Sequence, residues 1–582
     1  MSKQYSYSNV PSVRGQRNVF DLSHNVTTTM PIGKLVPIDF VEVLPGDSFT
    51  TRQSHLTRIT SAFLKPVMDN LYMDVYHFFV PHRIVFDGFE ETFGENKHGH
   101  WAASDMPEIP TIVRDGGFSG LTVQPGTIGD YLGLPIANGG ISASSDYELR
   151  GISLLPFRSY AMIWNEWFRD QNTQDPVNVQ TGDFGSVEST MISAASVTPI
   201  ASWSPTQYFG DLAPVDKFKD YFVSAVPDPQ KGEAVALNAG NVIVPASQIK
   251  VTTSGNTSLV NPSVPLYGKK TGTETIPSGI LLGLPSGSNP AVQKLSAYIA
   301  PDQTAYPNTG FVPTNLVADY QGASIPIGAL TINQLREAFA YQRMLERSAL
   351  YGSRYREYIL QAFGVSNGDS RLQIPEFLGG KRMPLNVQPV SQTSAQQGSG
   401  SPLGSVGATS STLGGSRYSK SFTEHGYVFT VACLRYKHTY QQGIDVKWTR
   451  KTRDDFYDPV FNHIGMQPIY SSELFAYGNN DVSQPNRNVF GYKLPYEEYK
   501  RLGNKVTGEV RSGITNSLDI FKFADYYTNA PVISDGFVRE NPDFVDRSVA
   551  VRSSSQDPFI VEFAFDIKAV RRMPMYNIPG GL

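Results

Sequence analysis

The 582-residue sequence contains a single cysteine, Cys433, which lies within the apolar run 431–434. Without a second cysteine the chain can form no internal disulfide, which fits assembly in a reducing cytoplasm. A lone cysteine in an apolar run is typical of a buried strand residue and not of a nucleophile or a metal ligand.

Long hydrophobic runs are also missing. No segment of roughly 18 or more apolar residues occurs, and the first residues lack the apolar stretch of a signal peptide. We therefore expect a soluble protein that is not secreted by a signal peptide.

Charge is scarce. Charged residues make up 18% of the chain, compared with about 25% in an average soluble protein. The formal net charge is −4, whereas neutralising a nucleic acid takes a surplus of Lys and Arg. Any phosphate-binding surface on this chain must therefore be local.

Recognisable catalytic motifs are absent, including the G-x-S-x-G, H-E-x-x-H, P-loop, Rossmann glycine and EF-hand patterns. His98 and His100 are the only close histidine pair, and without a third ligand they predict an exposed loop and not a zinc site. The adjacent carboxylates 454–455 and 497–498 would point to opposite faces of a strand, so neither pair forms an acid–base dyad by itself. We predict no catalytic residue, cofactor or metal, although a glycosidase could still assemble carboxylates from distant positions.

Aromatic and turn-forming residues are plentiful, with 30 Tyr, 33 Phe, 51 Gly and 40 Pro. Tyr and Phe with few charges indicate either a surface covered by neighbouring subunits or a large β protein. The Gly and Pro content favours many turns and loops over long helices.

Strand patterns cluster near the two ends of the chain. Extended runs rich in Val, Phe and Tyr occupy residues 35–44, 71–80, 427–436 and 444–448, and residues 559–568 alternate between apolar and polar. This arrangement predicts a mainly β protein, a β-sandwich whose first and last strands pair, as in a jelly roll. We expect 35–44 and 559–568 to be neighbouring strands of one sheet.

One helix is predicted over residues 331–363. Thr331 and Gln334 fit a capping box, apolar residues then recur at helical spacing, and Gly352 should break or kink the helix. Four arginines fall on one face, which we interpret as a solvated face or a subunit contact in preference to a DNA-binding surface: Arg336, Arg343, Arg347 and Arg354.

The remaining segments have distinct compositions. Residues 1–32 form an N-terminal arm, residues 33–175 and 321–582 form the two parts of the sandwich, and residues 176–320 are a polar, turn-rich surface insertion. Residues 391–416 lack Lys, Arg, Asp and Glu, so we predict a flexible loop there.

Two groups of basic residues lie among aromatic residues and are candidates for contact with single-stranded nucleic acid. The first lies in the arm and the second surrounds Trp448: Lys3, Arg14 and Arg17, and Lys447, Arg450 and Lys451. For the first group we favour the interpretation of an ordinary tethered terminus, and local salt bridges to Asp454 and Asp455 would explain the second group equally well.

Short motifs spread along the chain resemble the major capsid protein family of the Microviridae, small icosahedral single-stranded DNA phages, in its gokushovirus branch. No single motif is specific, but their order and spread are. The residues that carry the resemblance are Gly33, Lys34, Leu35, Pro37, Pro45, Gly46, Asp47, Phe79, Pro81, Pro375, Gly379, Gly380, Pro574 and Pro579.

The resemblance implies a single eight-stranded jelly roll with long insertions, many copies of which form a T=1 shell in the virion around circular single-stranded DNA. The insertion would form surface protrusions for host attachment. Implied partners are further copies of the chain, an internal scaffolding protein, a DNA pilot protein, a small basic DNA-binding protein and a host-cell surface receptor, with assembly in the bacterial cytoplasm. The alternative is a carbohydrate-binding or glycan-active β-sandwich protein.

Overall fold

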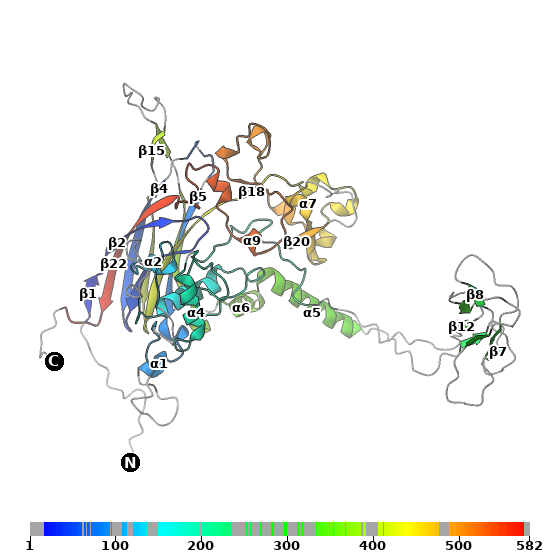
Figure 1. Ribbon diagram of the computed structural model, residues 1–582, viewed down its shortest axis with the longest axis horizontal. Helices are drawn as coiled ribbons and strands as arrows, with labels where there is room; N and C mark the ends of the chain where they lie inside the picture. Colours follow the sequence, from blue (N-terminus) through cyan, green and yellow to red (C-terminus); the bar gives the residue numbers. More distant parts are fainter. Residues whose placement is uncertain are drawn as a thin grey trace, which may run out of the picture. The chain divides into compact units, whose positions relative to one another are not determined.

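The computed structural model describes residues 17–233, 332–385 and 413–575 apart from short interruptions, together with short strands within 251–318 and 388–410. The longest interruptions are 96–106, 113–119, 137–148 and 477–487. The chain divides into two compact units, Met1–Glu233 with Arg343–Leu582, and Ala234–Gln342. The described part is mainly β, with several antiparallel sheets and few helices (Figure 1).

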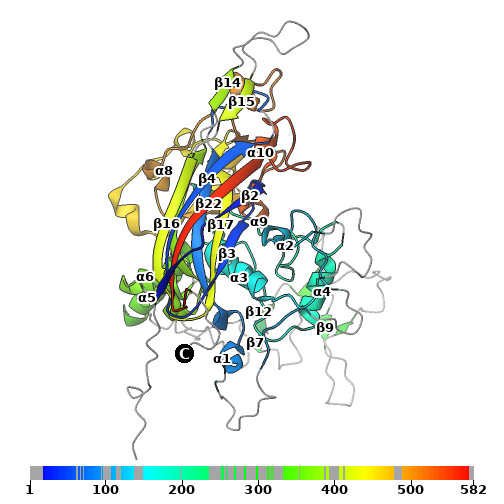
Figure 2. The same ribbon diagram turned by 90° about the vertical axis from the view of Figure 1, so that its left-hand side faces the viewer.

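The first sheet of the larger unit brings together strands from both ends of the chain. Its strands are β1 (Asn18–Asp21), β2 (His24–Met30), β4 (Ser48–Ile59), β16 (Leu413–Ser421) and β22 (Phe559–Arg571). β1 and β2 both pair with β22, β22 pairs with β4, and β4 pairs with β16, all antiparallel. β16, β4 and β22 run side by side in Figure 2. The strands that pair with β22 at the N-terminal end are thus β1 and β2, and not the strand predicted at 35–44.

The second sheet contains β3 (Val36–Val43), β5 (Leu71–Pro81), β13 (Glu376–Leu385) and β17 (Gly426–Tyr436), in the order β13-β5-β17-β3. The strands predicted at 35–44, 71–80 and 427–436 are therefore confirmed. Cys433 lies in β17 and is fully buried, as expected.

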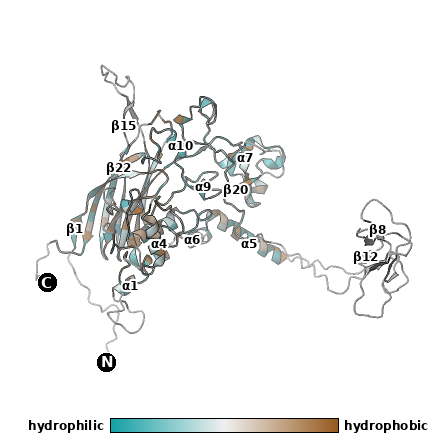
Figure 3. Ribbon diagram, in the orientation of Figure 1, coloured by the Kyte–Doolittle hydropathy of each residue, from teal (hydrophilic) through white to brown (hydrophobic). Residues whose placement is uncertain are grey.

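The core fills the space between the two sheets and continues through buried residues of 154–164 and 203–215, which belong to the same cluster. Along β22, residues with odd numbers from Phe559 to Ala569 are buried while most of their neighbours are exposed or half-buried, because successive side chains of a strand point to opposite faces. Figure 3 shows brown and teal segments alternating along the strands of this sheet. β17, by contrast, is buried along most of its length, as expected for a strand covered on both faces.

The helices of the described residues are mostly short. They are α1 (Phe89–Thr92), α2 (Ile128–Tyr131), α3 (Leu155–Ile163), α4 (Ser186–Ala195), α5 (Ile332–Tyr351), α6 (Tyr355–Phe363), α7 (Ser471–Leu474), α8 (Glu497–Lys500), α9 (Asp535–Val538) and α10 (Asp543–Asp546), with a π-helical turn, η5, at Trp164–Phe168. The helix predicted over 331–363 is thus two helices. They separate at Gly352, whose φ of +93° is a left-handed conformation that favours glycine. Thr331, the predicted cap, lies outside the described residues.

Small β ladders complete the larger unit. β18 (Thr439–Tyr440) pairs with β21 (Ala524–Asp525) in parallel, and β19 (Gln467–Tyr470) pairs with β20 (Val489–Lys493) antiparallel. β14 (Gln388–Ser391) pairs with β15 (Val406–Ser410).

Two strand predictions were wrong. β3 and β22 are not neighbours, because β3 pairs with β17 in the second sheet and β22 lies between β2 and β4 in the first. Residues 444–448 form no strand, because Val446–Trp448 is a short 3-10 helix whose cap, Asp445, accepts a hydrogen bond from the backbone N–H of Lys447 at 3.3 Å.

Two predicted segment limits also differ from the structure. Strands β1 and β2 lie inside the segment 1–32 that was predicted to be an arm. In the predicted loop 391–416, β15 and the first residues of β16 are strands. Gly414 and Gly415 allow β16 to approach β4 closely, since a Cβ on Gly415 would lie 2.5 Å from the carbonyl oxygen of Gln53.

The insertion predicted at 176–320 has different limits in the structure, where the smaller unit begins at Ala234. Residues 177–226 pack with the larger unit, and Trp203, Tyr208 and Phe209 belong to its hydrophobic core. A buried ion pair fixes this segment, because Arg158 Nη2 lies 2.8 Å from Glu188 Oε2 and both side chains are essentially inaccessible to solvent. The polar, turn-rich composition of this segment gave no indication that these aromatic residues are buried.

Within the smaller unit, three small sheets are described. β9 (Leu281–Gly283) pairs with β10 (Ser296–Tyr298), β8 (Gly268–Lys270) pairs with β11 (Phe311–Pro313), and β6 (Val251–Thr253) pairs with β7 (Thr257–Ser258) and β12 (Leu316–Ala318).

Candidate functional site

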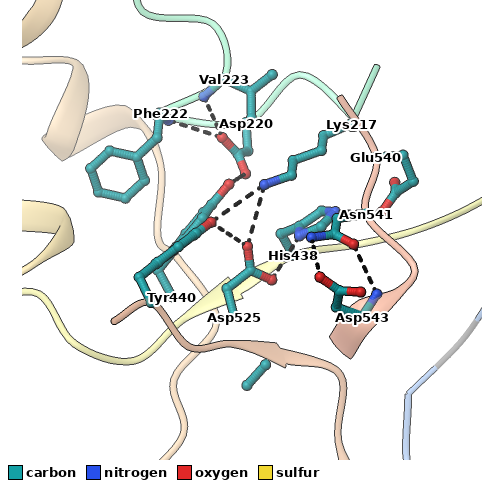
Figure 4. Close-up of polar contacts among 12 residues, drawn as sticks. Lys217, Asp220, Phe222, Val223, His438, Tyr440, Asp525, Glu540, Asn541 and Asp543 are labelled. Carbon is teal, nitrogen blue, oxygen red and sulfur yellow. Dashed lines mark hydrogen bonds and ion pairs between the residues drawn. The ribbon is translucent and has the colours of Figure 1, made fainter. Parts of the chain in front are cut away.

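A dense group of buried ionisable side chains surrounds His438, the residue before β18. Its Nδ1 lies 2.7 Å from Asp525 Oδ1, and its Nε2 lies 2.8 Å from Glu540 Oε1. Lys217 Nζ lies 3.5 Å from the other oxygen of Asp525, and the Tyr527 hydroxyl donates to that oxygen at 2.6 Å. Figure 4 shows His438, Lys217 and Asp525 converging from separate chain segments.

Burial and charge act in opposite directions on His438. Burial by itself would lower the pKa of the imidazole, but the charges of Glu540 and Asp525, and the hydrogen bonds to both, outweigh it and raise the pKa to about 9. Burial would raise the pKa of Asp525, yet the neighbouring His438 and Lys217 hold it below its ordinary value. His438 and Asp525 are therefore both charged at neutral pH.

This cluster connects chain segments and is closed to substrates. The side chains of His438, Asp525 and Glu540 are 0% exposed and that of Lys217 is 2% exposed. Next to it, the Tyr440 hydroxyl donates to Asp220 at 2.7 Å. The arrangement acts as an ionic cross-link that fixes the C-terminal segments against residues 217–220, and no solvent-accessible group is available for chemistry.

Sequence reasoning missed this cluster. Its members are separated by 87 and 102 residues from His438 to Asp525 and Glu540, and no short motif surrounds any of them. Only the fold brings them together.

The basic residues predicted to contact nucleic acid are mostly engaged with the protein itself. Arg17 donates to the backbone oxygen of Gly46 at 2.8 Å. Lys447 Nζ lies 2.6 Å from Asp445, and Arg450 lies 3.2 Å from Glu498 and stacks over the ring of Tyr499. The acidic partners of Lys447 and Arg450 are thus Asp445 and Glu498, and not the predicted Asp454 and Asp455.

The remaining candidates are Lys451, which lies near Trp448 in sequence, and the arm residues Lys3 and Arg14. Lys451 is exposed, and Trp448 is 77% exposed. Lys3 and Arg14 lie outside the described residues.

The motif residues near the N-terminus occupy positions with tight geometry. Gly33 has a φ of +75°, and a Cβ there would lie 2.7 Å from the backbone oxygen of Glu540. Lys34 Nζ lies 2.5 Å from Asp211, and the Leu35 N–H donates to the Ala213 oxygen at 2.8 Å. These contacts attach the start of β3 to the segment that follows α4.

A second motif forms the turn between β3 and β4. Gly46 has a φ of +91°, and Asp47 Oδ2 accepts a hydrogen bond from the Leu44 N–H at 3.0 Å. The same oxygen lies 3.0 Å from Arg571 Nε at the end of β22, so this turn joins the two sheets.

The remaining motif residues lie in strands or beside them. Pro37 in β3, Phe79 and Pro81 in β5 and Pro375 before β13 are buried, whereas Pro574 is exposed. Pro45 precedes Gly46 in its turn, Gly379 and Gly380 lie in β13 next to a bulge, and Pro579 lies outside the described residues.

In the described ranges, no group of three or more His, Cys, Asp or Glu side chains could hold a metal ion. His98 and His100 lie outside those ranges. No helix that the structure describes is both long and apolar enough to cross a membrane.

Comparison with known proteins decides the family. The model of the capsid protein (F protein) family matches residues 8–581. The chain belongs to the capsid protein (F protein) family.

Full-length relatives agree with this membership. The chain is 35% identical to capsid protein VP1 of Spiroplasma virus 4 over 97% of its length and 95% of the relative. It is 33% identical to capsid protein VP1 of Chlamydia phage 1 and 34% identical to that of Bdellovibrio phage phiMH2K, each over 99% of this chain and 97% of the relative. A member of this capsid family is a structural component of a virion, and the family is not one of enzymes.

Proposed function

We propose that this chain is the major capsid protein of a small single-stranded DNA phage of the Microviridae and that its copies assemble into a T=1 icosahedral shell around a circular genome. The observation that carries the proposal is similarity along nearly the whole chain to a capsid family and to three phage VP1 capsid proteins. Family membership favours this function over the alternative of a glycan-binding or glycan-active β-sandwich protein.

The proposal includes a single eight-stranded jelly roll, with β1 as an extension of β2. One sheet has the strand order β2-β22-β4-β16 and the other has the order β3-β17-β5-β13. When these eight strands are followed along the chain, each lies in the other sheet from the one before it, except that β13 lies in the same sheet as β5. Such exchange between two facing sheets is the pattern of a double Greek key. The order of the strands supports this part of the proposal.

The partners follow from charge and assembly. A chain with a net charge of −4 cannot neutralise a genome alone, so we include a small basic DNA-binding protein, together with an internal scaffolding protein and a DNA pilot protein, and assembly in the host bacterial cytoplasm. Residues 234–342 would supply the surface insertion that attaches to a host receptor. Lys3, Arg14, Arg17 and Lys451 are the proposed non-specific DNA contacts.

Electron microscopy of lysate from bacteria that express this chain with its scaffolding protein tests the function. We expect closed, uniform icosahedral particles whose purified subunit has the mass of this chain. A protein that stays monomeric at high concentration with the scaffold present would contradict the proposal, and binding to a glycan array by that monomer would favour the alternative.

A substitution of the arm tests the DNA contacts separately. Replacing Lys3, Arg14 and Arg17 with Ala should reduce the DNA content of each particle at raised salt, because every lost phosphate contact removes a salt-dependent increment of affinity. Shell geometry should not change. Unchanged DNA content with less stable shells would instead mean that the arm ties subunits together.

A further inference from the structure

The solvent side of α6 is apolar and aromatic. The rings of Tyr355 and Tyr358 are stacked with their centroids 6.4 Å apart, and the ring of Phe363 contacts that of Tyr358 at 6.1 Å. Their exposed fractions are 67%, 42% and 68%. With Leu360 and Val365, each 55% exposed, these residues form what we call the α6 aromatic face.

No charged side chain of α6 is directed into this face. The helix carries only two charges, Arg356 and Glu357. The Arg356 guanidinium lies 4.2 Å from the centre of the Trp167 ring, and Glu357 accepts a hydrogen bond from Gln171 at 2.8 Å. Both therefore point toward the body of the protein, whereas a solvated helix face normally carries charged residues.

Contacts with the body of the protein, on the side opposite the aromatic face, hold α6 rigidly. Arg354, its N-terminal flanking residue, donates to the backbone oxygen of Asn165 at 2.5 Å. Gly364 ends the helix in a left-handed conformation with a φ of 68°. The aromatic face is thus presented in a fixed position, which reduces the entropy lost when a partner binds.

The area of the face is on the scale of a protein interface. A large aromatic side chain buries roughly 150–250 Å², so the three rings at these exposed fractions present on the order of 350 Å², to which Leu360 and Val365 add. A standard interface takes roughly 800 Å² from each partner. Met344 and Tyr351 of α5, 46% and 58% exposed, add to the apolar surface that these helices expose; α5 and α6 are both labelled in Figure 1.

We propose that the α6 aromatic face is a contact between copies of this chain, with Tyr358 and Phe363 at its centre. The inference rests on the proposed function, because a shell requires every subunit to be covered by further copies on several sides. Charge depletion and aromatic enrichment are the composition of an interface core. Three exposed rings, with that of Tyr358 in contact with the other two, match the aromatic clusters that dominate binding energy.

Phe363→Asp tests the proposal, with Val532→Asp as its matched control. Both native side chains are 68% exposed, so neither change should disturb the core, and both introduce the same charge. We expect Phe363→Asp to lower the yield of closed particles at least about tenfold, the effect of losing a hot-spot side chain. Val532→Asp should assemble as the wild type does, and Phe363→Leu should restore most of the yield.

Thermal unfolding of each unassembled variant separates assembly from folding. If Phe363→Asp melts with the wild type but forms no particles, the face is a copy–copy contact. If Phe363→Asp fails to fold, Tyr355→Asp, at a side chain 67% exposed, takes its place. Particle yields equal to the wild type from a folded variant would overturn the inference. A wild-type chain that forms no particles would contradict the proposed function instead.

Discussion

At the scale of single residues, the charge state of His438 has a measurable consequence for stability. A histidine whose folded-state pKa is raised from 6.5 to about 9 binds its proton more tightly in the folded protein than in the unfolded chain. Its contribution is therefore complete below pH 6.5 and is lost as the pH rises through 9. For a fully buried group this is a loss of about 3 kcal/mol.

We predict that Glu540→Gln moves this loss of stability to lower pH. The substitution removes the charge that most raises the pKa of His438, so the midpoint of the alkaline loss should fall by about one pH unit or more. The measurement is the melting temperature of the unassembled subunit between about pH 6 and 10.

His24→Gln is the control for that experiment. The pKa of His24 is also raised to about 9, in this case by a hydrogen bond to Asp39 3.2 Å away, but the side chain is 35% exposed. The His24 variant should keep most of the alkaline loss. Identical pH curves for Glu540→Gln and the wild type would show that the buried cluster does not set the alkaline stability.

Residue-scale features were predictable where local sequence determines them. The burial of Cys433 followed from its apolar neighbours, and the helix break at Gly352 followed from the conformational freedom of glycine. The partners of His438 could not be predicted, because Asp525 and Glu540 lie 87 and 102 residues away in sequence and neither carries a motif.

At the scale of elements, β22 is the strand on which the first sheet depends. It lies between β2 and β4, and its even-numbered positions face outward while its odd-numbered ones enter the core. We predict that Phe563→Ala destabilises the larger unit by about 3–5 kcal/mol, because it leaves a cavity in a packed core.

Ile560→Ala is the matched change on the other face of the same strand. Ile560 is 43% exposed, so its truncation should alter the free energy of unfolding by about 0.5 kcal/mol or less. Chemical denaturation of both variants measures the difference. Equal effects would mean that the register of β22 differs from the one described.

The strands themselves were largely predictable, but their partners were not. Alternation along 559–568 depends only on the period of a strand, whereas the pairing of β3 with β17 depends on contacts almost 400 residues away in sequence. Composition also misled at β16, where glycines that predicted a loop instead allow close packing against β4.

At the scale of the whole molecule, the larger unit is built from two stretches of sequence and the smaller unit from the single stretch between them. The larger unit is built from Met1–Glu233 and Arg343–Leu582. The two ends of this break are adjacent within that unit, because the Lys231 N–H donates to the Leu345 oxygen at 3.3 Å. The cost of joining them through a short linker is therefore small, since loop-closure entropy changes slowly with length.

We predict that replacing residues 235–341 with a short Gly/Ser linker leaves the larger unit folded. None of the residues of the excised segment that the structure describes belongs to the sandwich core, so the shortened chain should keep its β-rich circular dichroism and melt within a few degrees of the full chain. The contrasting change is deletion of residues 177–226. This deletion falls inside the insertion predicted from sequence. It should nevertheless prevent folding, because it removes Trp203, Tyr208 and Phe209 from the core. A shortened chain lacking 235–341 that cannot fold would show that the smaller unit supports the sandwich. If the 177–226 deletion folds normally, the limits inferred from composition describe the molecule better than those of the structure.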